Sequence, residues 1–297
     1  MTGVLLIDKP AGPTSHDVVA CVRRATRERS VGHAGTLDPA ATGLLVVMLG
    51  AATRLASLLT GHDKTYEATI CLGQRTTTDD AQGDPIGDAH TGPWPDDAAI
   101  RAALDATLGT FPQMPPQFSA KRVDGTQAYK LARAETHAAL KPSEVSLRAW
   151  QWRDRDGASL RIEVRVSAGF YVRSLARDLG DALGCGAHLS ALRRTRSGAF
   201  DVADAVDLGT VVEHPDRLPA RVVSMAAALP ELPAVTLSDA GLARVKHGNP
   251  VGPQMIEGMW VSASNPPTRI RLLDHHGQLV ALADLRGGLL QPTAVLG

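Results

Sequence analysis

Apolar and polar residues follow two patterns along the chain, one typical of strands and the other of helices. Apolar runs, some alternating with a period of two, predict strands over the segments GVLLID, GLLVVMLG and KTYEATICLG. Capped segments with apolar residues three and four apart predict helices over TSHDVVACVRRAT, ATRLASLLTG and DDAAIRAALDATLG. The chain is therefore predicted to open as a strand followed by a helix.

The middle of the chain carries a hairpin and then a strand that runs into a helix. The segment SLRAWQWRDRDGASLRIEVRVS alternates around Asp156-Gly157, which predicts two antiparallel strands joined by a tight turn. The segment AGFYVRSLARDLGDALGCG is interpreted as a strand followed by a helix that ends at Gly184. Tyr171 and Arg173, two residues apart on that strand, are predicted to point to the same face of the sheet.

Two segments depart from the regular pattern. Residues from about 112 to 142 fit no compact strand-helix unit, and we predict that they form a projecting basic arm. After HLSALRRTRSGAF the pattern becomes less regular, and prolines at 215, 219, 230 and 233 are spaced like a linker. We therefore predict a large domain over residues 1–230 and a small β-rich domain over residues 231–297.

Charge is unevenly distributed, although the formal net charge is zero. Between Lys121 and Arg196 there are fifteen Lys and Arg residues against eight Asp and Glu, whereas Asp79 to Asp105 holds seven acidic residues and one Arg. A segregated basic surface attracts phosphates even in a neutral chain, although a solvated face also explains such an excess. The segment TTTDDAQGDPIGDAHTGPWP has turn chemistry throughout and is predicted to be an exposed acidic loop.

Composition and missing motifs exclude several classes of protein. No apolar run in the 297 residues is long enough to cross a bilayer and the N-terminus does not resemble a signal peptide, so we expect a cytoplasmic protein without membrane association. Three isolated cysteines argue against a disulfide framework and a zinc ribbon. Walker A, HExxH and GxSxG motifs are absent, and we expect neither a metal nor another cofactor.

The segment GHAGTLDP, residues 32–39, places one carboxylate in a glycine-bounded loop. Pro39 disfavours the helical region for Asp38 and so holds it extended, although Asp-Pro is also ordinary turn chemistry. An arginine beside an acid lowers its pKa, so an Asp38 paired with Arg173 is predicted to stay ionised and to act as a nucleophile. Tyr66 and His33 are further candidates in this region.

Four blocks, in the same order along the chain, resemble the bacterial tRNA pseudouridine-55 synthases of the TruB family over roughly residues 3 to 200. These blocks are LLIDKPAGPTSHDVV, RSVGHAGTLDPAATGLLVVMLGAATR, DKTYEATICLGQRTTTDDAQG and GFYVRSLARDLGDALGCGAHLSALRRTRSGAF. The resemblance implies an isomerase that detaches uracil from its ribose, rotates it and rejoins it through C5 in the T loop of tRNA. Together with the pattern, it predicts an α/β (α+β) fold: a pseudouridine synthase core with a mixed, largely antiparallel sheet flanked by helices, and a small PUA-like C-terminal domain.

The resemblance also assigns roles to residues. Asp38 matches the essential aspartate of the family, Tyr66 the tyrosine that stacks on the target base, and Arg173 the arginine paired with the catalytic carboxylate. The substrate-binding set that it implies is His33, Tyr171, Leu192 and Lys9, with the role of Lys9 interpreted as structural. The arm is expected to follow RNA phosphates through Lys121, Arg122, Lys130 and Arg133.

Purely structural roles stay open as alternatives for several of these residues. Tyr66 and Leu192 are also typical core residues, Arg173 has Asp178 as another acidic neighbour, and His33 suits a capping or packing role. The functional alternatives are an RNA-binding chaperone that refolds the T arm, and a carboxylate-nucleophile hydrolase. We expect a monomer that binds the T arm of tRNA without a guide RNA, and the route taken by Asp38, covalent attack or glycal-like elimination, stays open.

Overall fold

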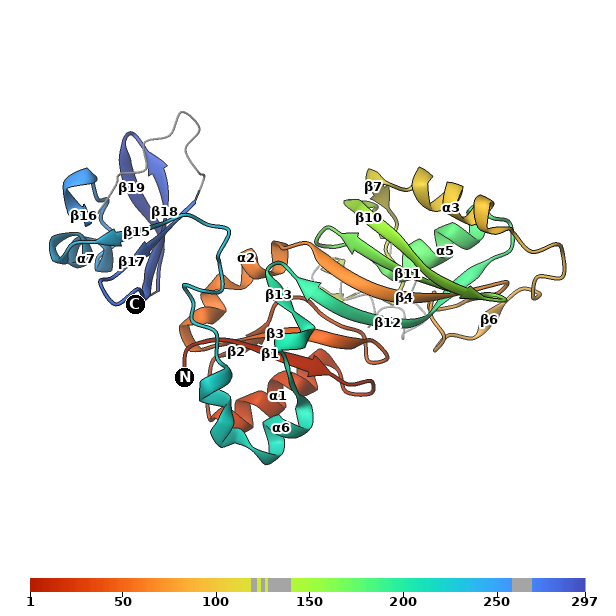
Figure 1. Cartoon of the computed structure of the whole chain (residues 1–297), viewed down its shortest axis with the longest axis horizontal. Coiled ribbons are helices and arrows are strands. Elements are labelled where there is room, and N and C mark those ends of the chain that lie inside the picture. The colour runs from red at the N-terminus through yellow and green to blue at the C-terminus, as the bar shows by residue number, and fades with distance from the viewer. Residues whose placement is uncertain (119–121, 124–125, 128–139, 258–268, 297) are drawn as a thin grey trace.

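Two β-sheets organise the chain. The computed structural model describes residues 1–118, 122–123, 126–127, 140–257 and 269–296 (Figure 1). The larger sheet has ten strands, and its main path runs in the order β14 (Val206–Asp207), β1 (Gly3–Lys9), β3 (Thr42–Leu49), β12 (Ala187–Ser197), β4 (Lys64–Leu72), β11 (Ser159–Val166), β10 (Ser143–Asp156) and β7 (Gly109–Gln113). Two further strands lie off this path, β13 (Phe200–Asp201) on β12 and β2 (Val31–His33) on β3.

Most neighbouring strands of the large sheet are antiparallel. The pairs β1/β14 and β3/β12 are parallel and the other described pairs of this sheet are antiparallel. Its helices and 3-10 turns are α1 (Ser15–Thr26), η1 (Gly50–Leu55), α2 (Ala56–Gly61), α3 (Asp97–Ala106), α5 (Val172–Ala182), η2 (Val202–Asp204), α6 (Leu208–Glu213) and η3 (Pro215–Arg221). The predicted mixed, largely antiparallel sheet flanked by helices is confirmed. The hairpins β5 (Arg75–Thr76)/β6 (Pro85–Ile86) and β8 (Arg122–Val123)/β9 (Thr126–Gln127) form separate two-stranded sheets.

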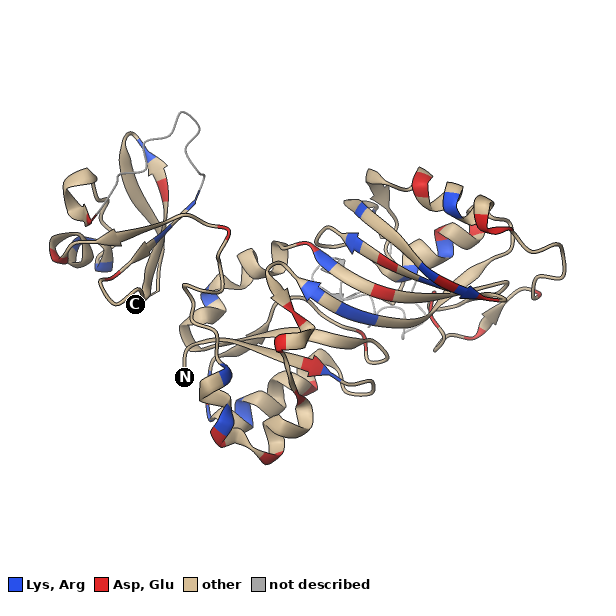
Figure 2. Cartoon of the chain, viewed as in Figure 1, with Lys and Arg blue, Asp and Glu red and all other residues tan. Residues whose placement is uncertain are grey.

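The two halves of the large sheet are buried differently. Strands β1 and β3 are apolar on both faces, because alternate residues enter two separate cores, as Leu5 and Val4 do. Strands β4, β10 and β11 bury one face beneath α3 and α5, while the other face carries mixed charges (Figure 2). Many of these charges are paired, for example Arg153 with Glu163 at 2.5 Å. The open face is therefore largely a self-neutralised, solvated surface.

A small C-terminal domain follows the large sheet. Its five strands run in the order β16 (Ile256–Glu257), β15 (Ala234–Leu237), β17 (Ile270–Leu273), β18 (Leu279–Arg286) and β19 (Leu289–Val295). The predicted β-rich character is confirmed, and the domain also contains α7 (Asp239–Lys246) and η4 (Pro253–Met255). One face of this domain packs against the large domain, because Leu279, Leu282 and Leu296 share a core with Val4 and Leu44.

One local prediction was wrong, and two elements were not predicted. Tyr171 and Arg173 do not lie on a strand, since α5 begins at Val172 with Tyr171 as its N-terminal cap residue. The long central strand β12 was not predicted, because the three arginines of this segment obscure its apolar pattern. Helix α7 of the β-rich C-terminal domain was also not predicted; Ser238 caps it by accepting a hydrogen bond from the Gly241 amide.

No helix in the described part of the chain is both long enough and apolar enough to span a membrane.

Candidate active site

The loop between β2 and β3 carries Asp38 and is fixed on both sides of it. The buried Ser15 hydroxyl at the start of α1 accepts a hydrogen bond from the Leu37 amide at 2.8 Å and donates one to the Leu37 carbonyl at 3.0 Å. The Pro39 carbonyl accepts hydrogen bonds from Lys9 Nζ at 3.1 Å and from the Gly12 amide at 2.9 Å. The two neighbours of Asp38 are thus held by the first strand-helix unit, and the carboxylate projects from a rigid loop.

Arg173 in the first turn of α5 holds two carboxylates at once. Its Nη2 lies 3.0 Å from Asp38 Oδ2, and its Nη1 lies 3.4 Å from Asp80 Oδ2. It also donates to the carbonyls of Thr78 and Phe118, at 3.1 and 2.8 Å. The Arg173 side chain is 6% exposed, whereas the Asp38 side chain is 43% exposed. A ligand can therefore reach the carboxylate, while the guanidinium that orients it stays buried.

The pKa of Asp38 differs from the expected direction. Burial raises the pKa of the Asp38 carboxyl, and the nearby Asp80 raises it further. Arg173 and, more weakly, Lys9 lower it, but they do not outweigh the burial. The prediction that an arginine partner would hold this pKa low was right about the effect of Arg173 and wrong about the net direction, because burial dominates.

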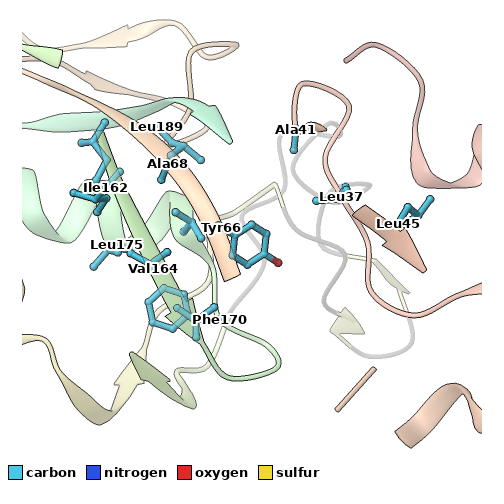
Figure 3. Close-up of a cluster of buried hydrophobic side chains, with 14 of the residues drawn as sticks. Leu37, Ala41, Leu45, Tyr66, Ala68, Ile162, Val164, Phe170, Leu175 and Leu189 are labelled. Carbon is cyan, nitrogen blue, oxygen red and sulfur yellow. The ribbon is translucent and has the colours of Figure 1, made fainter. Parts of the chain in front are cut away.

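Five of the predicted site residues line one cleft between the Asp38 loop and the start of α5. They are Asp38, Tyr66, Tyr171, Arg173 and Leu192. Tyr66 lies on the buried face of β4. Figure 3 shows its ring at the edge of the apolar cluster around Val164, with the hydroxyl directed toward the segment that carries Leu37. The cleft therefore combines an accessible carboxylate with an aromatic ring and an apolar wall, an arrangement suited to a planar base.

The other predicted residues do not line this cleft. Lys9 is fully buried and donates to the carbonyls of Pro10 and Pro39, so it supports the loop from behind. His33 ends β2 and is partly buried; this burial and the charge of Arg194 lower its pKa. Three residues of the predicted basic arm, Lys121, Lys130 and Arg133, lie outside the described residues, and only the backbone of Arg122 is described, in β8.

Sequence reasoning missed four residues around the cleft. Asp80 was assigned to an exposed loop, although it is 15% exposed and faces Arg173. Its neighbour Asp79 likewise turns inward, to Arg177 at 3.0 Å, and Asp178 pairs with Arg177 rather than with Arg173.

The sequence indicates Ser15 only as part of a helix cap, and it does not single out Lys64 and Arg194, although Lys64 and Arg194 line the cleft. The available signal for Asp80 was the pair Asp79-Asp80, together with Arg173 and Arg177, which are four residues apart.

Within the part of the chain that the structure describes, no three His, Cys, Asp or Glu side chains are grouped so that they could hold a metal ion.

Two family models match most of the chain. TruB family pseudouridylate synthase (N terminal domain) matches residues 23–172, and tRNA pseudouridylate synthase B C-terminal domain matches residues 173–229. The chain belongs to the TruB family of pseudouridylate synthases. The resemblance stated from the sequence is thereby confirmed, and with it the reaction class, an isomerase. The first model ends within the cleft, at the start of α5, so both models contribute residues to it.

Relatives and solved structures agree with this membership. The chain is 44% identical to a tRNA pseudouridine synthase B of Thermobifida fusca, an alignment that covers 99% of this chain and 98% of the relative. It is 40% identical to the protein of that name in Roseobacter denitrificans, with 100% and 96% covered. The fold matches a chain of the archaeal box H/ACA sRNP Nop10-Cbf5 complex with a TM-score of 0.74 at 27% identity, covering all of this chain and 86% of the other.

Proposed function

We propose that this TruB-family protein is a tRNA pseudouridine synthase that converts uridine 55 in the T loop to pseudouridine, with Asp38 as the essential catalytic carboxylate. The observation that carries the proposal is the accessible Asp38, held by Arg173 at 3.0 Å in a cleft with Tyr66. The relatives at 40 to 44% identity, which are named tRNA pseudouridine synthase B, support tRNA as the substrate.

The position of Tyr66 supports a mechanism in which the target base leaves its stack in the RNA. Tyr66 is 8% exposed and recessed beside Asp38, so a base within a folded loop cannot reach both groups without flipping. Extrusion costs a few kcal/mol, and stacking on an aromatic side chain returns about 1 to 3 kcal/mol. The two contributions are comparable, so Tyr66 offsets much of the flipping cost, while Leu192 provides an apolar contact in the same cleft.

The reaction exchanges one bond of the ribose for another. The C1′–N1 bond breaks and a C1′–C5 bond forms, while the hydrogen leaves C5 and N1 gains a proton. Asp38 initiates this exchange by covalent attack or by abstracting a ribose proton, and both routes need the ionised carboxylate. Arg173 fixes the direction of that carboxylate and stabilises its charge, which favours the ionised form against the effect of burial.

We further propose that the protein acts as a monomer in the cytoplasm and without a guide RNA. The near-complete alignment with a relative named tRNA pseudouridine synthase B supports an enzyme that acts on tRNA. The proposed domains are residues 1–230 and a PUA-like domain over residues 231–297, because a proline-containing linker precedes β15. The basic arm over residues 112–142 is proposed to grip the RNA.

Mapping the modified nucleotide tests the proposed position. An unmodified tRNA transcript is incubated with the protein, treated with a carbodiimide that marks pseudouridine, and read by primer extension. We expect one stop assigned to position 55, none with Asp38→Asn protein, and none with a transcript that carries cytidine at that position. Binding of the transcript without any pseudouridine would reject the enzyme and favour an RNA chaperone.

A further inference from the structure

Two buried cations lie in the wall of the cleft away from Arg173. Lys64, at the start of β4, is 6% exposed and Arg194, in β12, is 1% exposed. Lys64 Nζ donates to the carbonyls of Thr60 and His62, the latter at 2.7 Å. Arg194 donates to the carbonyls of Leu44 at 2.7 Å, Gly35 at 3.1 Å and Thr36 at 3.5 Å. Both side chains therefore bond to main-chain carbonyls in the cleft wall.

No carboxylate among the described residues forms an ion pair with either cation. Burying a charge without a counter-ion is costly, and hydrogen bonds to carbonyls offset only part of that cost. An ammonium group has three N–H donors and a guanidinium five, so both groups keep donors beyond the contacts seen here. Ser197, opposite Lys64 in the β4/β12 pairing, is 1% exposed and its hydroxyl has no hydrogen-bond partner in the described part of the chain. The cluster thus has spare donors and two positive charges that form no ion pair with a described residue.

The cluster opens into the cleft that holds Asp38. Thr60, Lys64 and Arg194 line it together with Gly35, which lies three residues before Asp38 on the same loop. Gly35 has a φ of 102°, and a Cβ there would lie 3.5 Å from Arg194 Nη1 and 3.6 Å from Lys64 Cε. The absence of a side chain at Gly35 leaves both cations open to a group that enters along this loop.

We propose that Lys64 and Arg194 form an anion subsite that binds a backbone phosphate of the RNA next to the flipped nucleotide. This inference rests on the proposed function, because it takes RNA as the ligand of the cleft. A flipped nucleotide brings its flanking phosphates to the mouth of the pocket that receives its base. Lys64 makes the contact, and Arg194, held in its three carbonyl bonds, supplies a fixed second charge and keeps the Gly35 turn in place.

The ionisation of Lys64 agrees with a role in binding an anion. Burial, with a smaller effect of Arg194 across the strand pair, lowers the pKa of Lys64 to about 8, and the neighbouring Asp63 opposes this. A bound phosphate supplies the missing negative charge and raises this pKa again. RNA binding through Lys64 should therefore weaken as the pH rises from 7 to 9.

A thermodynamic cycle on Lys64 and one phosphate tests the subsite. Binding is measured with T-arm RNAs in which a neutral methylphosphonate replaces one phosphate beside the target uridine, with a remote phosphate as the control. The protein carries Asp38→Asn throughout, so the result does not depend on catalysis. We expect Lys64→Met to weaken binding of unmodified RNA about tenfold. The methylphosphonate should weaken RNA binding by the protein with Lys64 to a similar extent, and the two changes together should weaken binding no more than either change alone.

Two comparisons separate a phosphate contact from a structural role. Lys64→Arg should keep the sensitivity to the methylphosphonate and lose the weakening between pH 7 and 9, because arginine stays charged. Lys246→Met, at an exposed lysine of α7, removes the same charge elsewhere and should keep the sensitivity. Additive effects of Lys64→Met and the methylphosphonate, or unchanged binding by Lys64→Met, would overturn the subsite. If Lys64→Met does not fold, a methylphosphonate penalty in the parent that is the same at pH 7 and 9 would overturn it.

Discussion

At one wall of the cleft Arg173 faces two carboxylates, Asp38 and Asp80, whereas at the other wall Lys64 and Arg194 face only main-chain carbonyls. The cation of the first wall has carboxylate partners without any ligand, and these ion pairs fix the direction of one reactive group. The second wall has an excess of positive charge that burial makes costly. The difference separates the wall that we propose carries out the chemistry from the wall that we propose binds a phosphate of the substrate.

Removing the guanidinium at the first wall should have the largest effect. Arg173→Met leaves two neighbouring carboxylates without their cation, which raises the pKa of Asp38 further and frees its side chain. We expect single-turnover pseudouridine formation to fall about 10²- to 10³-fold. Arg177→Met is the matched control, because Arg177 lies one helical turn further along α5 and pairs with Asp79 and Asp178 instead. Equal losses for both variants would show that α5 is merely destabilised.

Loosening the loop without touching its charges should have a smaller effect. Ser15→Ala removes both hydrogen bonds to Leu37 and leaves its amide and carbonyl without that partner, at a cost of about 1 to 3 kcal/mol. We expect kcat to fall about tenfold while the Kd for T-arm RNA stays unchanged. Thr14→Ala removes the cap of the same helix, costs about 1 kcal/mol and does not contact the loop. A similar loss of kcat in Thr14→Ala would assign the effect to helix stability.

Substitution of Asp80 should change the pH profile of kcat/KM. Asp38 must be ionised, so activity is lost as the pH falls through its pKa, which burial and Asp80 place above the ordinary value of 3.8. Asp80→Asn removes one of the two effects that raise this pKa, so the acid limb of kcat/KM should move to lower pH. Rates measured from pH 4 to 7 would show the shift. A limb that moves upward, or does not move, would contradict the assigned coupling of the two carboxylates.

The smallest effect is expected on the open face of the sheet. Arg161 on β11 pairs with Asp154, and both side chains are exposed. Exposed ion pairs contribute about 0 to 1 kcal/mol, so Arg161→Ala should change the free energy of unfolding by less than about 1 kcal/mol. Chemical denaturation measures this, and single-turnover activity should equal that of the parent. A large loss of activity would mean that this face takes part in the reaction, which would contradict the proposal that the reaction takes place in the cleft.

Sequence alone predicted those parts of the fold that local patterns encode. β1, α1, β3 and β4 appear where apolar periodicity and a Thr14 cap indicate them. β12 was missed because long-range pairing with β3 and β4 places this arginine-rich segment inside the sheet and buries Arg194, which no local pattern reveals. The same holds for the site. The family motifs indicated Asp38, Tyr66 and Arg173, whereas Asp80 and Ser15 become visible only when distant segments meet around the loop.

The central claim is that Asp38, held by Arg173, carries out the isomerisation. The most direct measurement is the release of tritium from a T-arm RNA labelled at uridine C5, followed in parallel with RNA binding for the parent protein and for Asp38→Asn. Bond formation at C5 must expel that hydrogen, so we expect stoichiometric release by the parent, none by Asp38→Asn, and comparable binding by both. Release by Asp38→Asn at the rate of the parent, or binding without release by either protein, would contradict the account.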